Sequence, residues 1–473
     1  MTNLKARDPR TGKLDYSFKM ASREDIERAS NRLRAAGQDW QKLGLDGRMA
    51  KLGDLSDALS RHRDAIAERL SVDTGRRQIS GREIDGVIGS IFGWLAQAPQ
   101  LLPEGWTDGR SNPAIRHAPQ FVPYTLLGVI SPWNFPVTLS MIDTIPALLA
   151  GCTVMIKPSE VTPRFVEPFI AAIEEAGLSD VLTFVQGDGS AGSALIDHVD
   201  AVCFTGSVAT GRKVAAAAAG NMIPAFLELG GKDPLLVLES ADIDKASDAA
   251  LRGSVLSTGQ ACQSIERIYV ARTVHDVFLE QLTEKAKTVE LNWPHIDRGH
   301  IGPIIFEKQA DILQQHIDDA VSKGARVLTG GKVENHGGGK WLLPTVLADV
   351  THDMAVMRDE TFGPILPVMA FDTVNDAIAL ANDTEFGLSA AVFAGTLDEA
   401  ETVGRQIEAG GVSLNDAALT GIFYEAEKHS FKLSGMGGSR MGPAGFQRFL
   451  RRKALIANTA APAPIGAFAE DAT

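Results

Sequence analysis

Cys262 is the residue of this chain best placed to act as a nucleophile. It follows the turn Gly259-Gln-Ala261 and precedes a strand-like run at 268–270, so we expect its thiol at the mouth of the fold, within reach of a substrate. Glu228 lies in a second glycine-containing turn, Glu228-Leu-Gly-Gly-Lys232. A thiol nucleophile and a separate carboxylate base are what covalent catalysis requires. The starting hypothesis is therefore a cysteine enzyme; the alternative for Glu228 is a salt-bridged residue at a strand end.

The composition narrows the class of protein. The chain has 473 residues, enough for two or three domains, and 44% of them are hydrophobic. The net charge is −13 and there is no basic run, which argues against nucleic acid or an anionic membrane as a partner. No signal peptide or spanning apolar segment is evident. Three cysteines without paired spacing argue against a disulfide framework or a metal site and favour the cytoplasm.

The elements that position these residues follow from hydrophobic spacing. Residues 21–99 carry apolar positions at helical intervals and predict an amphipathic helical layer. Short apolar runs then alternate with helical segments such as 164–176, which is typical of a parallel α/β sheet. These strand-like runs are 124–130, 153–156, 181–185, 201–204 and 224–228. A second α/β region begins near 231, and a Pro- and Gly-rich stretch at 103–123 predicts a protruding hairpin.

Polar residues and glycines follow the predicted strands at one edge of the first sheet, where such sheets bind ligands. The segments are 131–136, 157–160, 205–211 and 228–231. Gly187-Asp-Gly-Ser-Ala-Gly192 fits a dinucleotide fingerprint, but the helix after it is short and no acid follows at the ribose distance. The turn Thr205-Gly-Ser207 opens a fuller helix and is the better phosphate site.

Seven motifs, in order, resemble those of the NAD(P)-dependent aldehyde dehydrogenases, over residues 20–458. They are Pro132-Trp-Asn-Phe135, Lys157-Pro-Ser-Glu160, Phe204-Thr-Gly-Ser207, Leu227-Glu-Leu-Gly-Gly-Lys232, Gly259-Gln-Ala-Cys262, Glu360-Thr-Phe-Gly-Pro364 and Asn382-Asp-Thr-Glu-Phe-Gly-Leu388. The resemblance implies a Rossmann-like cofactor domain (1–104, 124–230 and 433–450) and an α/β catalytic domain (231–432). It also implies a small β oligomerisation element (105–123 and 451–473) and a homodimer or homotetramer.

The resemblance also implies the chemistry. Cys262 attacks the aldehyde carbon, and the Asn134 amide with the Cys262 N–H holds the oxyanion of the thiohemiacetal. Loss of hydride leaves a thioester, which Glu228 hydrolyses by activating water. Lys232 is expected to be structural rather than an activator of the thiol, and Glu266 with Arg267 to form a structural ion pair. Cys152 and Cys203, in apolar runs, are expected to be buried thiols.

The cofactor expected by resemblance is NAD, with NADP as the alternative. Lys157 and Glu160 resemble the pair that holds the adenine ribose, and a carboxylate at Glu160 repels a 2′-phosphate. Trp133 and Ser207 match positions at the pyrophosphate, and Glu360 and Phe362 match positions at the nicotinamide ribose and ring. The remaining residues expected to contact the cofactor are Ser131, Pro132, Ser159, Gly206, Gly211, Leu229 and Gly230.

The substrate is the least transferable expectation. The side chains expected to line its tunnel are Thr138, Leu139, Ile142, Ala261, Gln263, Phe423 and Tyr424. They favour an apolar aromatic or aliphatic aldehyde, since a carboxylate-bearing one is expected to need a nearby arginine. The sequence departs from the family at Lys428-His-Ser-Phe-Lys-Leu-Ser-Gly435, where His429 and Ser430 replace two glycines.

Two other classes of function compete with this reading. One is a cysteine enzyme that transfers the acyl group to coenzyme A or acts as an esterase, although family members that use coenzyme A commonly lack the glutamate found at Glu228. The other is a noncatalytic binding protein that kept the fold, which the presence of Cys262, Glu228 and Asn134 together argues against.

Overall fold

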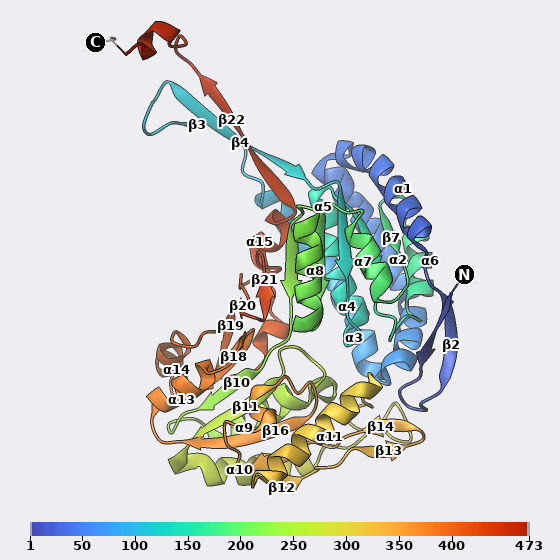
Figure 1. Ribbon diagram of the computed structural model, residues 1–473, viewed down its shortest axis with the longest axis vertical. Coiled ribbons are helices and arrows are strands. Elements are labelled where there is room, and N and C mark those ends of the chain that lie inside the picture. The colour runs from blue at the N-terminus through green and yellow to red at the C-terminus, as the bar shows by residue number, and fades with distance from the viewer. Residues whose placement is uncertain (1, 471–473) are drawn as a thin grey trace.

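Two sheets, one for each half of the chain, form the two lobes of the molecule, and an arm extends from the upper lobe (Figure 1). The computed structural model describes residues 2–470. This mixed α/β architecture with parallel sheets confirms the predicted fold class. No helix among the described residues has the length and apolar character needed to cross a membrane.

The first sheet is parallel except for one edge strand. Its strand order is β21-β9-β8-β5-β6-β7, with β21 antiparallel to β9. The chain enters at the central strand β5, proceeds outward through β6 and β7, then crosses to β8 and β9. The order therefore reverses between β5 and β8, the place where sheets of this kind bind ligands. The bounds are β5 (Leu126–Ile130), β6 (Thr153–Lys157), β7 (Leu182–Phe184), β8 (Ala201–Thr205), β9 (Ala225–Glu228) and β21 (Gly435–Met436).

Helices cover both faces of this sheet. One hydrophobic core joins its strands to α2, α3, α5 and α6, and a second joins them to α1, α7 and α8. The helix bounds are α1 (Arg23–Lys42), α2 (Gly44–Thr74), α3 (Arg77–Gln97), α5 (Thr144–Ala150), α6 (Val166–Glu175), α7 (Gly189–Ile196) and α8 (Val208–Gly220). Ser22 and Asp25 form a capping box that fixes the start of α1. The predicted helical layer at 21–99 is confirmed.

The second sheet has the order β12-β15-β16-β11-β10-β18-β19 and is parallel except for β12. Its strands are β12 (Arg326–Thr329), β15 (Thr345–Ala348), β16 (Ile365–Phe371), β11 (Ile265–Ala271), β10 (Asp233–Val237), β18 (Ser389–Phe393) and β19 (Gly411–Leu414). Helices α9 and α10 pack on one face and α11, α13 and α14 on the other. Their bounds are α9 (Ile243–Val255), α10 (Arg272–Lys287), α11 (Glu307–Ser322), α13 (Val374–Asn382) and α14 (Leu397–Gly404).

The arm is a three-stranded antiparallel sheet of order β22-β4-β3. It pairs β22 (Leu450–Asn458) along the full length of β4 (Ile115–Pro123), with β3 (Thr107–Asp108) at the edge. The hairpin expected at 103–123 therefore exists, and its main partner is the end of the chain. Four further elements are the small pairs β1 (Asn3–Arg7) with β2 (Leu14–Lys19) and β17 (Phe386–Gly387) with β20 (Phe431–Lys432).

Candidate active site

The carboxyl ends of the first sheet's strands meet at one edge, as the strand order requires. The N–H of Ser131 donates to Lys157 O at 3.1 Å, and the N–H of Gly206 donates to Glu228 O at 3.1 Å. These bonds tie the segments that follow β5, β6, β8 and β9 to one another. The four polar segments that follow these strands in the sequence thus lie together at one edge of the sheet.

The loop that carries Cys262 reaches this edge from the second lobe. It follows α9 and contains three consecutive residues in the left-handed region: Ser257 (φ 60°), Thr258 (φ 61°) and Gly259 (φ 67°). A left-handed conformation is costly for a β-branched residue such as threonine, so neighbours must hold it. The buried side chain of Gln260 does so, donating to Ser257 O and Pro303 O at 3.2 Å each and accepting from Ile305 N at 2.8 Å.

The electrostatic surroundings of Cys262 leave its thiol protonated near neutral pH. Burial raises the pKa of the Cys262 thiol to about 12. The ammonium of Lys428 acts against this rise, whereas the carboxylates of Asp233 and Glu228 add to it. Because the thiolate is the nucleophile, a base must take the proton as the sulfur attacks.

Asn134 contacts the cysteine loop directly. Its side-chain Nδ2 donates to Gln260 O at 3.0 Å, two residues before Cys262. Asn134 is buried and lies just before α4 (Pro136–Met141), whose N-cap is Phe135, so it does not cap that helix. An amide nitrogen carries two hydrogens, and one remains for an oxyanion formed beside Cys262.

A buried ion pair from α3 holds this segment from behind. The Arg76 guanidinium donates to Asn134 O at 2.5 Å and lies over the Phe135 ring. Glu83 accepts from the N–H groups of Val137 and Thr138 at 3.2 and 3.1 Å. It therefore caps α4 from another helix. Neither side chain was singled out in the sequence, because neither carries a recognisable motif.

Glu228 is the last residue of β9 and is half-buried. Its Oε2 accepts a hydrogen bond from Ser430 Oγ at 2.9 Å. Among the residues that the structure describes, no ion pair neutralises it, so the salt-bridged alternative finds no support there. Its negative charge contributes to the raised pKa of the Cys262 thiol.

The second lobe contributes the aromatic ring of Phe362 and the carboxylate of Glu360 to this region. The ring of Trp133 lies edge-on to Phe362 with 5.4 Å between centroids, so the structure brings these two predicted cofactor residues together. Glu360 Oε1 accepts from Gly231 N at 3.2 Å, and a Cβ on Gly230 would lie 2.5 Å from both carboxylate oxygens of Glu360. Burial, and next the Glu266 carboxylate, raise the pKa of Glu360 to about 8.

The expected ion pair between Glu266 and Arg267 is wrong. Neighbouring residues of a strand point to opposite faces, and both lie in β11. Glu266 instead pairs with Lys232 at 2.8 Å and accepts from Thr361 N and Phe362 N at 2.7 Å each. Lys232 is therefore structural, as expected, because its ion pair with Glu266 fixes the turn that carries Glu360 and Phe362.

The adenosine side of the site is also preformed. Lys157 Nζ and Glu160 Oε2 lie 2.8 Å apart beyond the end of β6. Ser207 is the N-cap of α8 and accepts from Thr210 N at 3.4 Å. Gly211 sits against Leu229, since a Cβ there would lie 2.5 Å from Leu229 Cδ2. The Lys157 ammonium, the Glu160 carboxylate and the N-terminus of α8 are groups that suit a dinucleotide. Ser131 and Ser159 are buried and Pro132 half-buried in the same turns.

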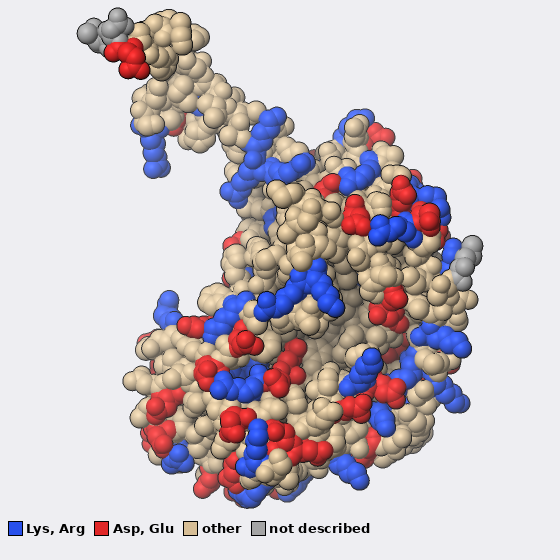
Figure 2. Space-filling model, viewed as in Figure 1, with Lys and Arg blue, Asp and Glu red and all other residues tan. Residues whose placement is uncertain are grey.

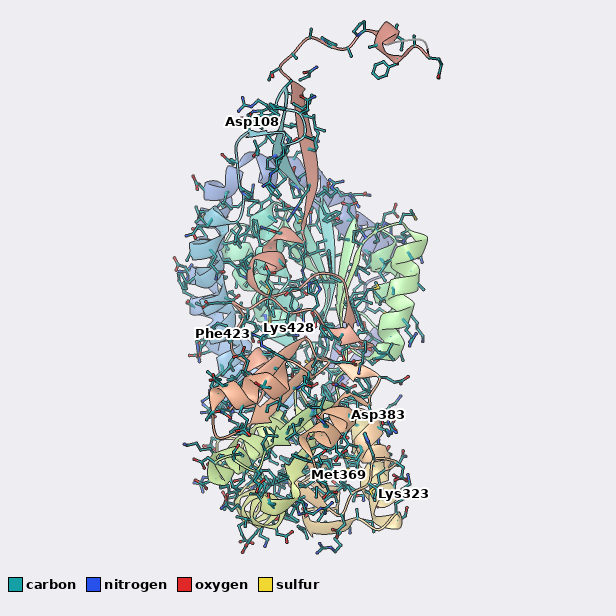
Figure 3. The ribbon with its side chains drawn as sticks, turned by 90° about the vertical axis from the view of Figure 1, so that its left-hand side faces the viewer. Asp108, Lys323, Met369, Asp383, Phe423 and Lys428 are labelled. Carbon is teal, nitrogen blue, oxygen red and sulfur yellow. The ribbon has the colours of Figure 1, made fainter. Side chains whose placement is uncertain are left out.

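The residues expected to line the substrate tunnel fall into two groups, exposed aromatic side chains and half-buried side chains. Gln263 Oε1 accepts from Thr420 Oγ1 at 3.2 Å, which joins the cysteine loop to the segment that bears Phe423 and Tyr424. Both aromatic side chains are exposed, at 52% and 45%. Figure 3 places Phe423 and Lys428 at the level between the two lobes. Half-buried Ala261, Thr138, Leu139 and Ile142 lie on the cysteine loop, on α4 and at its C-cap, and their place in a tunnel stays a prediction.

Sequence reasoning missed two cations of the site. Lys428 is 9% exposed and has no carboxylate within ion-pair distance among the described residues. Arg440 is buried and donates to Asp143 Oδ2 at 2.7 Å and to Thr205 Oγ1 at 2.8 Å. Arg440 lies in none of the motifs found in the sequence, and Lys428 was only quoted as part of the stretch Lys428–Gly435 that departs from the family pattern.

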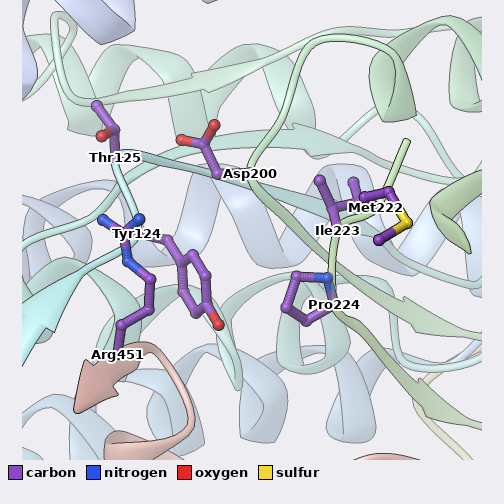
Figure 4. A pocket seen from close by; sticks show the side chains of 7 residues that line it. All are labelled: Tyr124, Thr125, Asp200, Met222, Ile223, Pro224 and Arg451. Atoms are coloured by element: carbon purple, nitrogen blue, oxygen red, sulfur yellow. The ribbon is translucent and has the colours of Figure 1, made fainter. Parts of the chain in front are cut away.

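A hollow of about 440 Å³ lies elsewhere, at the base of the arm (Figure 4). It is lined by residues that precede the strands, Thr125, Asp200 and Pro224 among them. The hollow therefore faces the amino ends of β5, β8 and β9, opposite the edge that holds Glu228. It is separate from Cys262, Glu228 and Asn134.

Comparisons with known proteins agree with this geometry. The model of the Aldehyde dehydrogenase family matches residues 2–455. A putative NADP(+) succinate-semialdehyde dehydrogenase of Mycolicibacterium smegmatis is 36% identical over 93% of this chain and 86% of its own. The structure of putative aldehyde dehydrogenase PutA from Anabaena variabilis superposes with a TM-score of 0.96 at 52% identity, covering 98% of this chain and 99% of that one. Betaine aldehyde dehydrogenase from Staphylococcus aureus, in complex with NAD+, gives 0.90 at 28% identity over 98% and 93%.

Proposed function

The chain belongs to the aldehyde dehydrogenase family and is an enzyme that oxidises an aldehyde to its acid, and from that premise we propose that Cys262, Glu228 and Asn134 carry the reaction. The observation that supports this most is their convergence. Asn134 bonds to the loop of Cys262, and the Glu228 carboxylate acts on the same thiol. These contacts support a site between the lobes in which a nucleophile, a base and an oxyanion donor act together.

The roles follow from the chemistry of each group. The sulfur of Cys262 adds to the carbonyl carbon, and its proton passes to solvent water. The free N–H of Asn134 and the backbone N–H of Cys262 hold the oxyanion. The nicotinamide cofactor, when bound, accepts hydride from that adduct. Glu228 then takes a proton from water as the water attacks the thioester, and the acid leaves Cys262.

We propose NAD as the cofactor, held by Lys157 and Glu160 at the adenine ribose, by Ser207 near the pyrophosphate and by Glu360 and Phe362 at the nicotinamide end. Glu160 is 42% exposed at its side chain and carries the charge that opposes a 2′-phosphate. We expect kcat/KM to be higher with NAD than with NADP. The variant Glu160→Ser is expected to narrow this difference, and equal use of both cofactors by the parent enzyme contradicts the assignment.

For the substrate we propose an apolar aromatic or aliphatic aldehyde. The segment at the mouth exposes Ile422, Phe423 and Tyr424, of which Ile422 is 67% exposed. Three neighbouring exposed apolar side chains at a site entrance are typical of a surface that binds an apolar group. Gln263 ties this segment to the cysteine loop, which supports a path to Cys262 along it.

A second candidate is an aldehyde that carries a carboxylate, and Lys428 favours it. A nearly buried ammonium without a carboxylate partner is costly, and an anionic group of the substrate relieves that cost. The relative from Mycolicibacterium smegmatis, named as a putative succinate-semialdehyde dehydrogenase, points the same way. Lys428 also has a role without it, because its charge favours the Cys262 thiolate.

Formation of NADH with hexanal, benzaldehyde and succinate semialdehyde tests the function and the substrate together. We expect hexanal or benzaldehyde to give the highest kcat/KM, with no dependence on coenzyme A and no activity in Cys262→Ala. A preference for succinate semialdehyde that is lost in Lys428→Met establishes the second candidate. Acyl-coenzyme A as the product establishes the acyl-transfer alternative instead.

Assembly and place of action complete the proposal. We propose that residues 1–104, 124–230 and 433–450 form the cofactor domain and 231–432 the catalytic domain. The arm (105–123 and 451–473) would join copies into a homodimer or homotetramer in the cytoplasm. Along β22 almost every side chain is exposed, including Ile456 at 70%, which supports an interface there.

A further inference from the structure

The hydrogen bond between Ser430 and Glu228 is asymmetric with respect to the two carboxylate oxygens. Ser430 Oγ donates to Oε2 at 2.9 Å. No other donor among the described residues bonds to this side chain, so Oε1 keeps its lone pairs for a water molecule. A carboxylate fixed at one oxygen has a defined orientation, whereas a carboxylate without that bond rotates freely about its last two torsions.

The fold places Ser430 over Glu228 through the strand pairing of β21 with β9. Gly435 is the cross-strand partner of Glu228, and Leu229 N donates to Ser434 O at 2.8 Å. A Cβ on Gly435 would lie only 2.7 Å from Ser430 Cβ. The bare backbone of Gly435 is therefore what lets Ser430 approach the end of β9.

The segment that carries Ser430 is braced on both sides. Lys428 N donates to Ser439 Oγ at 3.1 Å, and the imidazole Nδ1 of His429 lies 3.3 Å from Gly437 O. Phe431 and Lys432 form β20, which pairs with β17 of the second lobe. Ser430 is thus fixed relative to both lobes, and its hydroxyl is not a mobile surface group.

From this geometry we infer that Ser430 is a positioning residue for Glu228, and that it governs the hydrolysis of the thioester on Cys262. The inference rests on the proposed role of Glu228 as the base. Water attacks the acyl carbon through its oxygen while Oε1 of Glu228 takes one proton. The carbon–sulfur bond breaks, the sulfur leaves as thiolate, and that proton returns to it, so the products are the acid and the free thiol. Ser430 exchanges no proton and only orients the carboxylate.

The test compares Ser430→Ala, which removes the hydroxyl, with Ser430→Thr, which keeps it. Steady-state kcat with hexanal and NAD is measured together with the fraction of acylated Cys262, by rapid quench and intact mass. We expect Ser430→Ala to lower kcat about five- to tenfold and to raise the acylated fraction, since a hydrogen bond to a charged group is lost. Ser430→Thr is expected to stay within about twofold of the parent. Ser322→Ala, a remote hydroxyl deletion on α11, serves as the control.

The outcomes separate this inference from the proposed function. If Glu228→Gln loses turnover while Ser430→Ala keeps the kcat and acylated fraction of the parent, Glu228 stands as the base and the role of Ser430 is wrong. An equal loss in the alanine and threonine variants, without a rise in acylated enzyme, also contradicts it, because packing alone then explains the effect. If Glu228→Gln turns over at the parental rate, the proposed base itself is wrong.

Discussion

Cys262 combines a half-buried side chain with a nearby cation that opposes the effect of burial on the thiol pKa. Burial raises its pKa to about 12, and Lys428 lowers it from the value that burial alone would give. Burial prevails, so the resting sulfur is a thiol, and its reactivity depends on a base and on the nearby positive charge. Cys152 and Cys203 are fully buried, at 0% and 1% exposure, and out of reach of a substrate, so neither competes as the nucleophile.

Replacing Lys428 is predicted to slow the alkylation of Cys262. Loss of the ammonium in Lys428→Met removes the charge that lowers the thiol pKa, so the thiolate fraction at any pH below that pKa falls. We expect about tenfold slower reaction with iodoacetamide for each unit by which the pKa rises. The measurement is the alkylation rate of Cys262 against pH, located by peptide mass.

Lys432→Met is the matched control, because Lys432 lies in the same segment but pairs with Glu408 at 2.8 Å. Its alkylation profile is expected to match that of the parent. A Lys428→Met profile that also matches the parent shows that Lys428 does not act on the sulfur.

Residue types indicated a nucleophilic cysteine and a carboxylate base, and the resemblance to a known family added Asn134 as the expected oxyanion donor. They did not identify Arg76, Glu83, Lys428, Ser430 or Arg440 as parts of the site. These side chains act through contacts between residues far apart in the chain, such as Arg76 with Asn134, 58 positions away, and Ser430 with Glu228, 202 positions away. Spacing in the sequence carries no signal for such pairs, because the fold alone brings them together.

At the scale of elements, the start of α4 is capped by a side chain from a different helix. It is only six residues long and has no side-chain cap of its own. Glu83 of α3 supplies the acceptor, and burial raises the pKa of Glu83 to about 7 while Arg76 opposes the rise. The position of Asn134 therefore rests on a buried pair in a different helix.

Glu83→Leu is predicted to destabilise the enzyme and to lower its activity. It removes the acceptor for two N–H groups and leaves the buried Arg76 without its carboxylate partner, a loss of about 3–5 kcal/mol. We expect the melting temperature to fall by about 5–10 °C, together with kcat. Asp85→Ala, two positions along α3, removes the exposed partner of Arg63 and is expected to change the melting temperature by at most about 2 °C. Equal shifts in the two variants contradict the account.

The elements were predictable where their pattern was strong. The alternation of strands and helices from 124 to 228 gave the first sheet, since each strand is a continuous apolar run. The short buried strand β18 was missed, because Ser389-Ala-Ala-Val-Phe393 has no alternation and becomes a strand only by pairing with β10 and β19. Helix α11 was overlooked although its buried Ala310, Leu313, Ile317 and Ala320 have helical spacing. The pair β1 with β2 gave no clear signal.

At the scale of the molecule, the packing of the two lobes does not explain why the chain has an extended arm. Its outer end carries few charged side chains (Figure 2), and Ile465 and Phe468 beyond it are 88% and 73% exposed. Apolar side chains displayed on an extension contribute nothing to the stability of an isolated chain, so another copy is the partner that we expect to cover them.

Ile456→Lys is predicted to break the assembly. A charge in the middle of β22 is costly only if that strand lies in an interface, so we expect light scattering to show a species of half the parental mass or less. Ile312→Lys is the control, because Ile312 is exposed on α11 of the other lobe. An unchanged mass for Ile456→Lys excludes β22 from the interface.

The central claim is that Cys262 carries the acyl group and that Glu228 releases it. The most direct measurement is the intact mass of Glu228→Gln after brief reaction with hexanal and NAD, followed by peptide mapping. The account predicts about one acyl group per chain, on Cys262, with one NADH formed for each and little further turnover. An unmodified chain that turns over at the parental rate, or an acyl group on another residue, contradicts it.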